Sequence, residues 1–333
     1  MKKAYLSFNQ RNDNLGDVII CHILYEILTE NIEVQFVGPT PYNYSNLTTI
    51  SPKKRYIHFI KDFILKNDIY EFVSPGGPVF SDNKNTSIGR HITLFLNRFK
   101  KTIFPFSSIT NLGSLKTLRS HLDLFNVFLI RDNKSLELLN QLDITKNSKV
   151  FKTTDISFYL NYEFQKRTND KKIAVSLRAS IPEKHININE QHLILLKSVN
   201  EINKNIEYCY QVDEDLDYLS EIFPKKVYNK LDFYNWKEYY NQFDVILTNR
   251  LHVALMAMSR GVIPIVSTSP NHSKLISIFK ENNLEELLVC DTNNVNKKIN
   301  FIFENSSDLR EKMQLAFSKN KASILNDIHE III

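Results

Sequence analysis

Glycine is scarce in this chain, which has only seven glycines among 333 residues. An average composition would supply roughly 23, so collagen-like sequences and glycine-rich linkers are excluded. Each glycine is therefore a candidate for a position where the backbone turns tightly. Hydrophobic residues make up 43% of the chain and charged residues 24%, a globular composition that can bury a large core. At this length two domains are the ordinary expectation.

Cysteine and strong charge are also lacking. Cys21, Cys209 and Cys290 stand far apart in no zinc-binding spacing, so we expect reduced thiols and no metal site. The net charge is only +5, and the lysines and arginines are scattered along the chain, which disfavours a nucleic-acid partner. This mild basic excess is compatible with anionic ligands or with a membrane surface.

Long apolar runs are absent: none approaches the roughly 18 residues that a membrane-spanning helix needs. Met1-Lys2-Lys3 resembles the start of a signal peptide, but the apolar stretch Ala4–Phe8 behind it is too short. We therefore expect a cytoplasmic protein, for which peripheral contact with the inner face of the membrane stays open.

Short apolar runs alternate with amphipathic stretches, which is typical of a parallel α/β sheet. The expected strands are Ala4–Phe8, Val34–Val37, Ile69–Val73, Val127–Ile130, Ile173–Leu177, Ile206–Tyr210, Phe243–Leu247 and Val262–Val266. The expected helices are Val18–Leu28, a segment through Ser135–Leu139, Leu193–Val199, Leu251–Met258 and Asp308–Ile333. Gly261 follows the fourth of these helices where a helix-ending glycine belongs.

The polar segment Asn161–Lys172 lacks hydrophobic periodicity and is the expected linker. It would separate a Rossmann-like domain at residues 1–165 from a second one at 172–290, with a helical tail at 291–333. We expect an α/β fold in which the two Rossmann-like domains face a cleft. Because ligands of open α/β sheets bind beyond the carboxyl ends of the strands, the loops there should carry the function.

Two such loops follow strands of the first domain. Asn14-Leu15-Gly16-Asp17 combines a glycine turn with a carboxylate in the first turn of a helix. Asp17 is either a helix cap or part of a ligand site, because the same free amides serve both. The Gly76-Gly77 pair, with Asp82 behind it, fits neither a P-loop nor a dinucleotide fingerprint. A structural turn and a ligand loop both remain open for it.

Two further loops follow strands of the second domain. Arg178 ends a buried strand, and it is either a surface residue or an anion clamp. Asn249, Arg250 and His252 surround the start of a helix. An arginine suits phosphate or carboxylate, and a histidine can move a proton near neutral pH, although a solvated arginine and a core histidine would look the same. Together these loops suggest a binder of small phosphorylated anions.

Several ordered motifs resemble the polysaccharide pyruvyl transferase family. They are NLGD at 14–17, PGGPVFSD at 75–82, LIRDNKS at 129–135, TDISFYL at 154–160, AVSLR at 174–178 and DVILTNRLHVALMAMSRGVIPIV at 244–266. The RLH motif behind its strand is the most specific of them. Lys274 also falls where the family has a lysine.

This resemblance implies a GT-B-like fold and a transferase of cell-surface glycan synthesis. Phosphoenolpyruvate would be the donor, and a sugar of an exopolysaccharide, a capsule or a lipid-linked precursor would be the acceptor. The product would be a pyruvyl ketal, formed without a cofactor or metal. A glycosyltransferase that uses a nucleotide sugar is the alternative, and an inactive binding module is a third reading.

The resemblance and the positions of the four loops together suggest roles for individual residues. Arg178, Asn249, Arg250, His252 and Lys274 would bind phosphoenolpyruvate. The acceptor side would comprise Asn14, Gly16, Asp17, Gly76, Gly77 and Asp82. His252 would act as the general acid, and Asp17 would accept a proton from the attacking hydroxyl.

The chain departs from the family at two places. Pro78 stands where a third glycine is usual, and residues 106–113 keep only Gly113 of a Gly-Gln-x-x-Gly-Pro loop. Both departures lie on the expected acceptor side.

Overall fold

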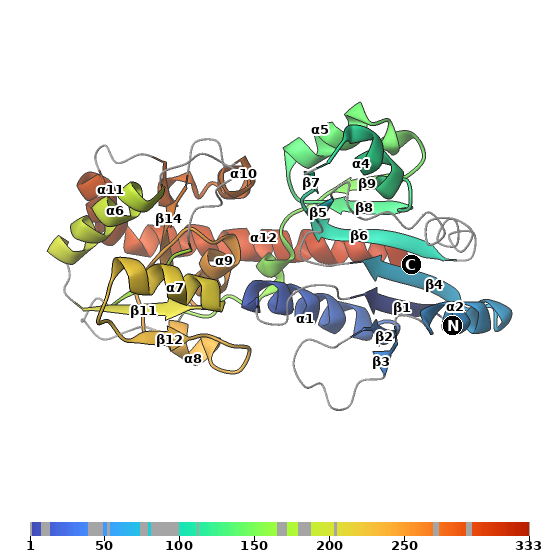
Figure 1. Ribbon diagram of the computed structural model, residues 1–333, viewed down its shortest axis with the longest axis horizontal. Helices are drawn as coiled ribbons and strands as arrows, with labels where there is room; N and C mark the ends of the chain where they lie inside the picture. Colours follow the sequence, from blue (N-terminus) through green and yellow to red (C-terminus); the bar gives the residue numbers. More distant parts are fainter. Residues whose placement is uncertain are drawn as a thin grey trace. The chain divides into compact units, whose positions relative to one another are not determined.

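A computed structural model of the chain shows two compact units, each with its own parallel sheet (Figure 1). It describes residues 2–7, 14–38, 49–51, 54–73, 79–80, 100–111, 113–164, 172–178, 188–202, 205–268, 273–290 and 295–332. Unit 1 comprises residues 1–12, 17–156 and 322–333. Unit 2 comprises residues 13–16 and 157–321.

The sheet of unit 1 has seven parallel strands in the order β3-β2-β1-β4-β6-β8-β9. These strands are β1 (Lys2–Ser7), β2 (Glu33–Val37), β3 (Thr49–Ile50), β4 (Asp68–Val73), β6 (Lys101–Ser107), β8 (Val127–Ile130) and β9 (Lys149–Lys152). A separate two-stranded ribbon pairs β5 (Val79–Phe80) with β7 (Thr110–Asn111). The helical segments are α1 (Leu15–Thr29), α2 (Arg55–Ile64), α4 (Leu115–Leu122), α5 (Asn133–Gln141), η1 (Ile144–Lys146) and η2 (Ile156–Tyr159).

The sheet of unit 2 has six parallel strands in the order β12-β11-β10-β13-β14-β15. These strands are β10 (Ile173–Ser176), β11 (Ile206–Tyr210), β12 (Tyr228–Lys230), β13 (Val245–Thr248), β14 (Ile263–Ser267) and β15 (Leu288–Val289). The helical segments are α6 (Ile188–Ile202), α7 (Asp213–Ile222), α8 (Trp236–Tyr240), α9 (Leu251–Ser259), α10 (Ser273–Glu281), η4 (Glu285–Leu287), α11 (Val295–Glu304) and α12 (Ser306–Ile332).

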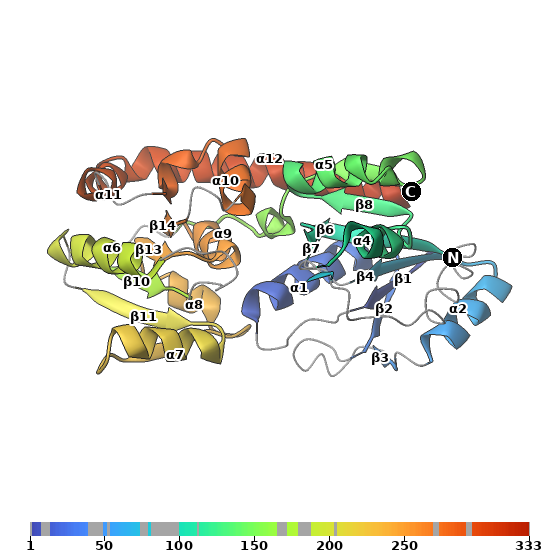
Figure 2. The same ribbon diagram turned by 45° about the horizontal axis from the view of Figure 1, so that its top comes forward.

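Local chemistry explains where several helices begin and end. Ser114 and Asp132 precede α4 and α5, and their side chains accept hydrogen bonds from backbone amides of the first turn. Helix α9 ends before Gly261, whose positive φ of 70° is the left-handed conformation that glycine adopts easily. The strands β10, β13 and β14 are buried along their whole length, as expected for parallel strands covered on both faces (Figure 2).

Both units share one strand order. Numbered along the chain, the six main strands of each sheet run 3-2-1-4-5-6, and β9 extends the sheet of unit 1. This is the doubly wound order, in which the connections reverse direction between the first and fourth strands and leave a crevice for ligands. The reversal falls between β1 and β4 in unit 1 and between β10 and β13 in unit 2.

The predicted α/β architecture is confirmed, and most predicted elements lie within a residue or two of the observed ones. The expected tail contains α11 and α12, and residues 322–333 group with unit 1. Of the expected linker 161–172, the structure describes residues 161–164 and 172.

Candidate active site

The two strands that flank the reversal in unit 2 end side by side. β10 and β13 are paired through Ser176 and Thr248, and Arg178 and Asn249 follow these strand ends. The buried amide of Asn249 accepts a hydrogen bond from the Arg178 backbone N–H at 3.0 Å and donates one to the Arg178 carbonyl at 2.9 Å. These two bonds hold one strand-end loop in register with the other.

Three charged side chains meet behind this junction. Asp215, in the first turn of α7, is buried and forms an ion pair with Arg250. Burial and, secondly, the neighbouring Arg250 charge lower the pKa of Arg178 to about 10, while Asp215 acts in the opposite direction. Burial raises the pKa of Asp215, and Arg250 and Arg178 counteract that rise. One carboxylate, paired with Arg250, thus lies near two guanidinium groups, and the cluster keeps an excess positive charge.

Two buried atoms of this cluster lack a hydrogen-bond partner within the described part of the chain. They are Arg250 Nε and Asp215 Oδ2. A buried polar atom without a partner costs about 1–3 kcal/mol, and such atoms call for a ligand or water to complete them. The positive excess favours an anion at this place.

Helix α9 adds a dipole to the same junction. Arg250 is its N-cap residue and forms no side-chain cap, while the Arg250 backbone N–H donates to Thr248 Oγ1 at 3.1 Å. His252 lies in the first turn of this helix. The positive end of the helix dipole therefore lies at the arginine pair, an arrangement suited to a phosphate or carboxylate.

Gly16 packs against His252. A Cβ atom added to Gly16 would lie 2.7 Å from both Cβ and Nδ1 of His252. Residues 13–16 group with unit 2 although the rest of α1 belongs to unit 1, so this contact lies within one unit. Only glycine leaves room for the imidazole at this distance.

Of the remaining predicted site residues, the structure describes some and not others. Asn14 directly precedes α1, and Asp17 is buried in its first turn, where its charge adds to burial in raising the pKa of the Cys21 thiol. Lys274 belongs to the first turn of α10, but its side chain is not among those described. Gly76, Gly77 and Asp82 lie outside the described residues.

Asp215 is the site residue that the sequence reasoning missed. It is one of three consecutive acids, Asp213, Glu214 and Asp215, at the start of the helix that follows β11. Such a cluster is an ordinary helix-start signal. Burial singles out Asp215, because Asp213 is exposed and pairs with Lys230.

No group of three or more histidine, cysteine or acidic side chains is placed to hold a metal ion in the described part of the chain. In the same part, no helix has the length and apolar character required to cross a membrane.

The comparison with protein families identifies the class. The model of the family described as polysaccharide pyruvyl transferase matches residues 14–266, which include β10, β13 and the arginine pair. The chain therefore belongs to the polysaccharide pyruvyl transferase family and is a transferase of polysaccharide pyruvylation. A search of curated proteins found no match.

Solved structures agree on the fold. The co-structure of S. aureus MnaA with UDP matches with a TM-score of 0.60 at 14% sequence identity, and the alignment covers 100% of this chain and 98% of the MnaA chain. Anabaena Alr3699/HepE in complex with UDP-glucose has a TM-score of 0.59 at 12% identity and covers 99% of both chains. The UDP-GlcNAc 2-epimerase from Methanocaldococcus jannaschii has a TM-score of 0.50 at 11% identity over 90% and 92%. These similarities show a GT-B-like fold, as the sequence predicted.

Proposed function

We propose that this protein transfers pyruvate, as a ketal, from phosphoenolpyruvate to a sugar of a cell-surface polysaccharide or of its lipid-linked precursor. One observation supports the choice of donor: Arg178 and Arg250 lie close together at the chain reversal of unit 2, and the neighbouring Asp215 carboxylate, which pairs with Arg250, balances only one of their two positive charges. Phosphoenolpyruvate carries both a phosphate and a carboxylate, and each is a natural partner of a guanidinium group.

The reaction needs a proton donor, and we assign this role to His252. Protonation of the methylene carbon of phosphoenolpyruvate gives an oxocarbenium-like centre at C2, which a sugar hydroxyl attacks. The C2–O bond to phosphate then breaks, phosphate leaves, and a second hydroxyl closes the ketal. Each hydroxyl gives up one proton: one balances the proton added to the methylene carbon, and the other is carried away with the phosphate.

The other residues would support these steps. Arg178 and Arg250 would neutralise the departing phosphate, with Lys274 as a third cation. Asn249 would act by holding the Arg178 backbone in place, because its own amide is engaged there. Asp17 would accept the proton of the attacking hydroxyl, and Asn14, Gly16, Gly76, Gly77 and Asp82 would line the acceptor side. No cofactor or metal enters this scheme.

The direct test is incubation with phosphoenolpyruvate and candidate lipid-linked or synthetic glycosides. Mass spectrometry should find one pyruvyl group added with loss of water, together with released phosphate. Thermal-shift titration then tests the donor. Stabilisation by phosphoenolpyruvate but not by nucleotide sugars supports the proposal, and the reverse result would replace it by a glycosyltransferase.

The proposed acid gives a sharper prediction. We expect His252→Ala to lower turnover at saturating phosphoenolpyruvate by about 10²-fold or more, the usual scale for loss of an acid–base group. His329→Ala, in the exposed part of α12, is the matched control and should keep normal turnover. A His252→Ala enzyme with near-normal steady-state rates would remove His252 from this role.

A further inference from the structure

Helix α2 of unit 1 presents an apolar stripe to solvent. Ile57, Ile60 and Ile64 are spaced at three and four residues, so they share one helix face, and they are 66%, 51% and 71% exposed. Phe63 and Leu65 extend the apolar surface at the end of the helix. Five of the twelve large hydrophobic residues exposed in the described part of the chain fall within these nine positions.

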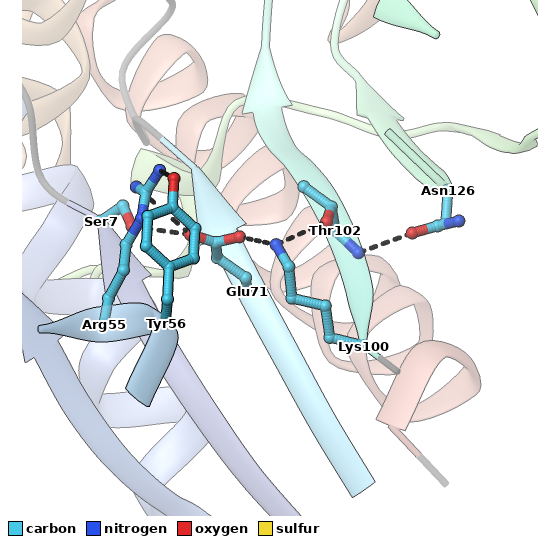
Figure 3. A network of polar contacts seen from close by, with 7 residues as sticks. All are labelled: Ser7, Arg55, Tyr56, Glu71, Lys100, Thr102 and Asn126. Carbon is cyan, nitrogen blue, oxygen red and sulfur yellow. Dashed lines mark hydrogen bonds and ion pairs between the residues drawn. The ribbon is translucent and has the colours of Figure 1, made fainter. Parts of the chain in front are cut away.

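The opposite face of α2 is fixed to the sheet by polar contacts. Arg55 contacts Glu71 of β4 at 3.7 Å and donates a hydrogen bond to the hydroxyl of Tyr56 at 2.8 Å, as Figure 3 shows. Glu71 is buried and also forms an ion pair with Lys100. The Tyr5 hydroxyl of β1 donates to the buried Asp62 carboxylate. Because these contacts fix the orientation of the helix, its isoleucine stripe faces solvent and not the core.

Cations surround this stripe. Lys61 lies on the same face, and Lys54 and Lys66 flank the helix, all three exposed. A cavity of about 1060 Å³ adjoins the end of the helix, where β4, β6, β8 and β9 begin. Phe63 and Ile64 form part of its wall together with Lys2, Lys66, Lys100, Lys101 and Lys149. The acidic residues of the same wall are Asp68 and Glu330, and Glu330 pairs with Lys149.

We propose that the outer face of α2, defined by Ile57, Ile60, Lys61, Ile64 and Leu65, docks on an anionic lipid membrane. Apolar side chains that enter the headgroup region and lysines that contact anionic headgroups are the two components of interfacial helix binding. A protein partner is the weaker fit, because lysine is depleted from the cores of protein–protein interfaces and Lys61 lies within the stripe. The docking does not depend on the proposed chemistry.

Flotation of the full-length protein with vesicles tests this surface. Vesicles containing about a third phosphatidylglycerol should carry the protein, pure phosphatidylcholine vesicles should carry far less, and binding should weaken near 1 M salt, where the Debye length is about 3 Å. Ile57→Asp with Ile64→Asp should lower the partition coefficient about tenfold or more. Lys54→Glu with Lys61→Glu should do the same at low salt, since each lysine near the surface contributes roughly fivefold.

Matched controls lie on another surface of unit 1. Leu115→Asp in α4 removes an exposed apolar side chain, and Lys116→Glu with Lys134→Glu reverses two exposed lysines outside α2. Both controls should bind vesicles like the parent. Equal loss in the controls and in the α2 variants would overturn the assignment.

A fluorescent reporter separates membrane docking from self-association. The natural Trp236 is the one tryptophan of the chain and is buried, so Ile60→Trp adds an exposed reporter at the stripe. Its emission should shift to the blue when anionic vesicles are added. The proposal would be overturned if the emission does not shift and the protein does not float with the vesicles. If sedimentation then shows a dimer that Ile57→Asp with Ile64→Asp dissociates, α2 is an interface between two copies of the chain.

Discussion

Asp215 pairs with Arg250 and lies close enough to Arg178 to influence its charge. We expect Asp215→Asn to weaken binding of phosphoenolpyruvate about 10-fold to 100-fold, because Arg250 loses the charged hydrogen bond that orients it, a bond of about 1.5–3 kcal/mol. Isothermal titration of the purified variant measures this loss. Asp215 would be a positioning residue, acting through Arg250.

Asp213→Asn is the matched control, because Asp213 shares the same first turn but is exposed and paired with Lys230. It should bind the donor like the parent. Donor affinity that is unchanged in Asp215→Asn would contradict the positioning role. A lower melting temperature alone would indicate a purely structural pair.

His192 gives a pH prediction. Its side chain is fully buried with Nδ1 2.8 Å from the Tyr218 hydroxyl, and burial lowers its pKa to about 3. In the unfolded chain this imidazole takes up a proton near pH 6.5, whereas in the folded chain it stays neutral until about pH 3. The free energy of unfolding therefore falls as the pH falls from 6.5 towards 3. We expect a loss of about 1.5 kcal/mol from this residue between pH 6.5 and pH 5.

Urea unfolding at several pH values measures that slope. His192→Asn should unfold at lower urea concentration but show a flatter pH dependence in this window. His329→Asn, at an exposed histidine, should keep the parent slope. If His192→Asn keeps the full slope, the buried imidazole does not cause it.

Most residues of the candidate site, but not all, could be predicted from the sequence. Arg178, Asn249, Arg250 and His252 could be chosen from sequence because polar residues directly after apolar strands stand out. Asp215 could not, because its neighbours Asp213 and Glu214 have the same chemistry and only burial distinguishes it.

At the scale of elements, two glycines lie where a side chain would collide with a neighbour. A Cβ at Gly16 would meet His252 at 2.7 Å, and one at Gly261, whose φ is positive, would meet the Phe164 ring at 2.5 Å. We expect Gly16→Ala to lower turnover by at least about tenfold through displacement of the imidazole, since a misplacement of about 1 Å costs on the order of 10²-fold.

Gly261→Ala is the comparison, and it should act on stability instead. The left-handed conformation alone costs about 1 kcal/mol for alanine, and the contact with Phe164 adds to it. Adding Phe164→Ala to the Gly261→Ala variant should recover only the part of the stability loss that comes from the contact with Phe164. Measuring the melting temperature and turnover of all variants separates the effect on activity from the effect on stability. A Gly16→Ala enzyme with full activity would show that the contact with His252 tolerates a methyl group.

Strand prediction succeeded where apolar residues cluster between polar segments. Val127–Ile130 coincides with β8, because a buried parallel strand is a continuous apolar run, and Ile206–Tyr210 coincides with β11 although Glu207 interrupts its apolar residues. Strand β6 escaped prediction because Pro105 interrupts its run and a register shift falls between Phe104 and Ser107. Two-residue strands such as β3 and β15 carry too little pattern to predict.

At the scale of the whole molecule, one helix contributes to both units. Residues 306–321 of α12 group with unit 2, and residues 322–332 group with unit 1. The latter bury Ile324, Ile328, Ile331 and Ile332, and the Tyr70 hydroxyl donates to the Ile332 carbonyl at 3.1 Å.

A chain that ends at Lys321 should therefore lose unit 1 while keeping unit 2. Four buried isoleucines contribute roughly 6–12 kcal/mol at 1.5–3 kcal/mol each, comparable with the total stability of a domain. Limited proteolysis with mass spectrometry should show rapid cleavage within residues 17–156 and a resistant fragment from unit 2. Full-length Glu330→Gln, a surface change in the same segment, is the control. Equal resistance of both units in the shortened chain would contradict this dependence.

The sequence by itself determined the α/β class, the family and the polar residues at the strand ends, because apolar periodicity and motif order are local properties of the chain. The tertiary structure alone decided that Asp215 pairs with Arg250 beside Arg178, that Gly16 packs on His252 and that the isoleucines of α2 face outward. The physical reason is that burial and charge pairing arise from strand order, which brings together segments that lie far apart in the sequence.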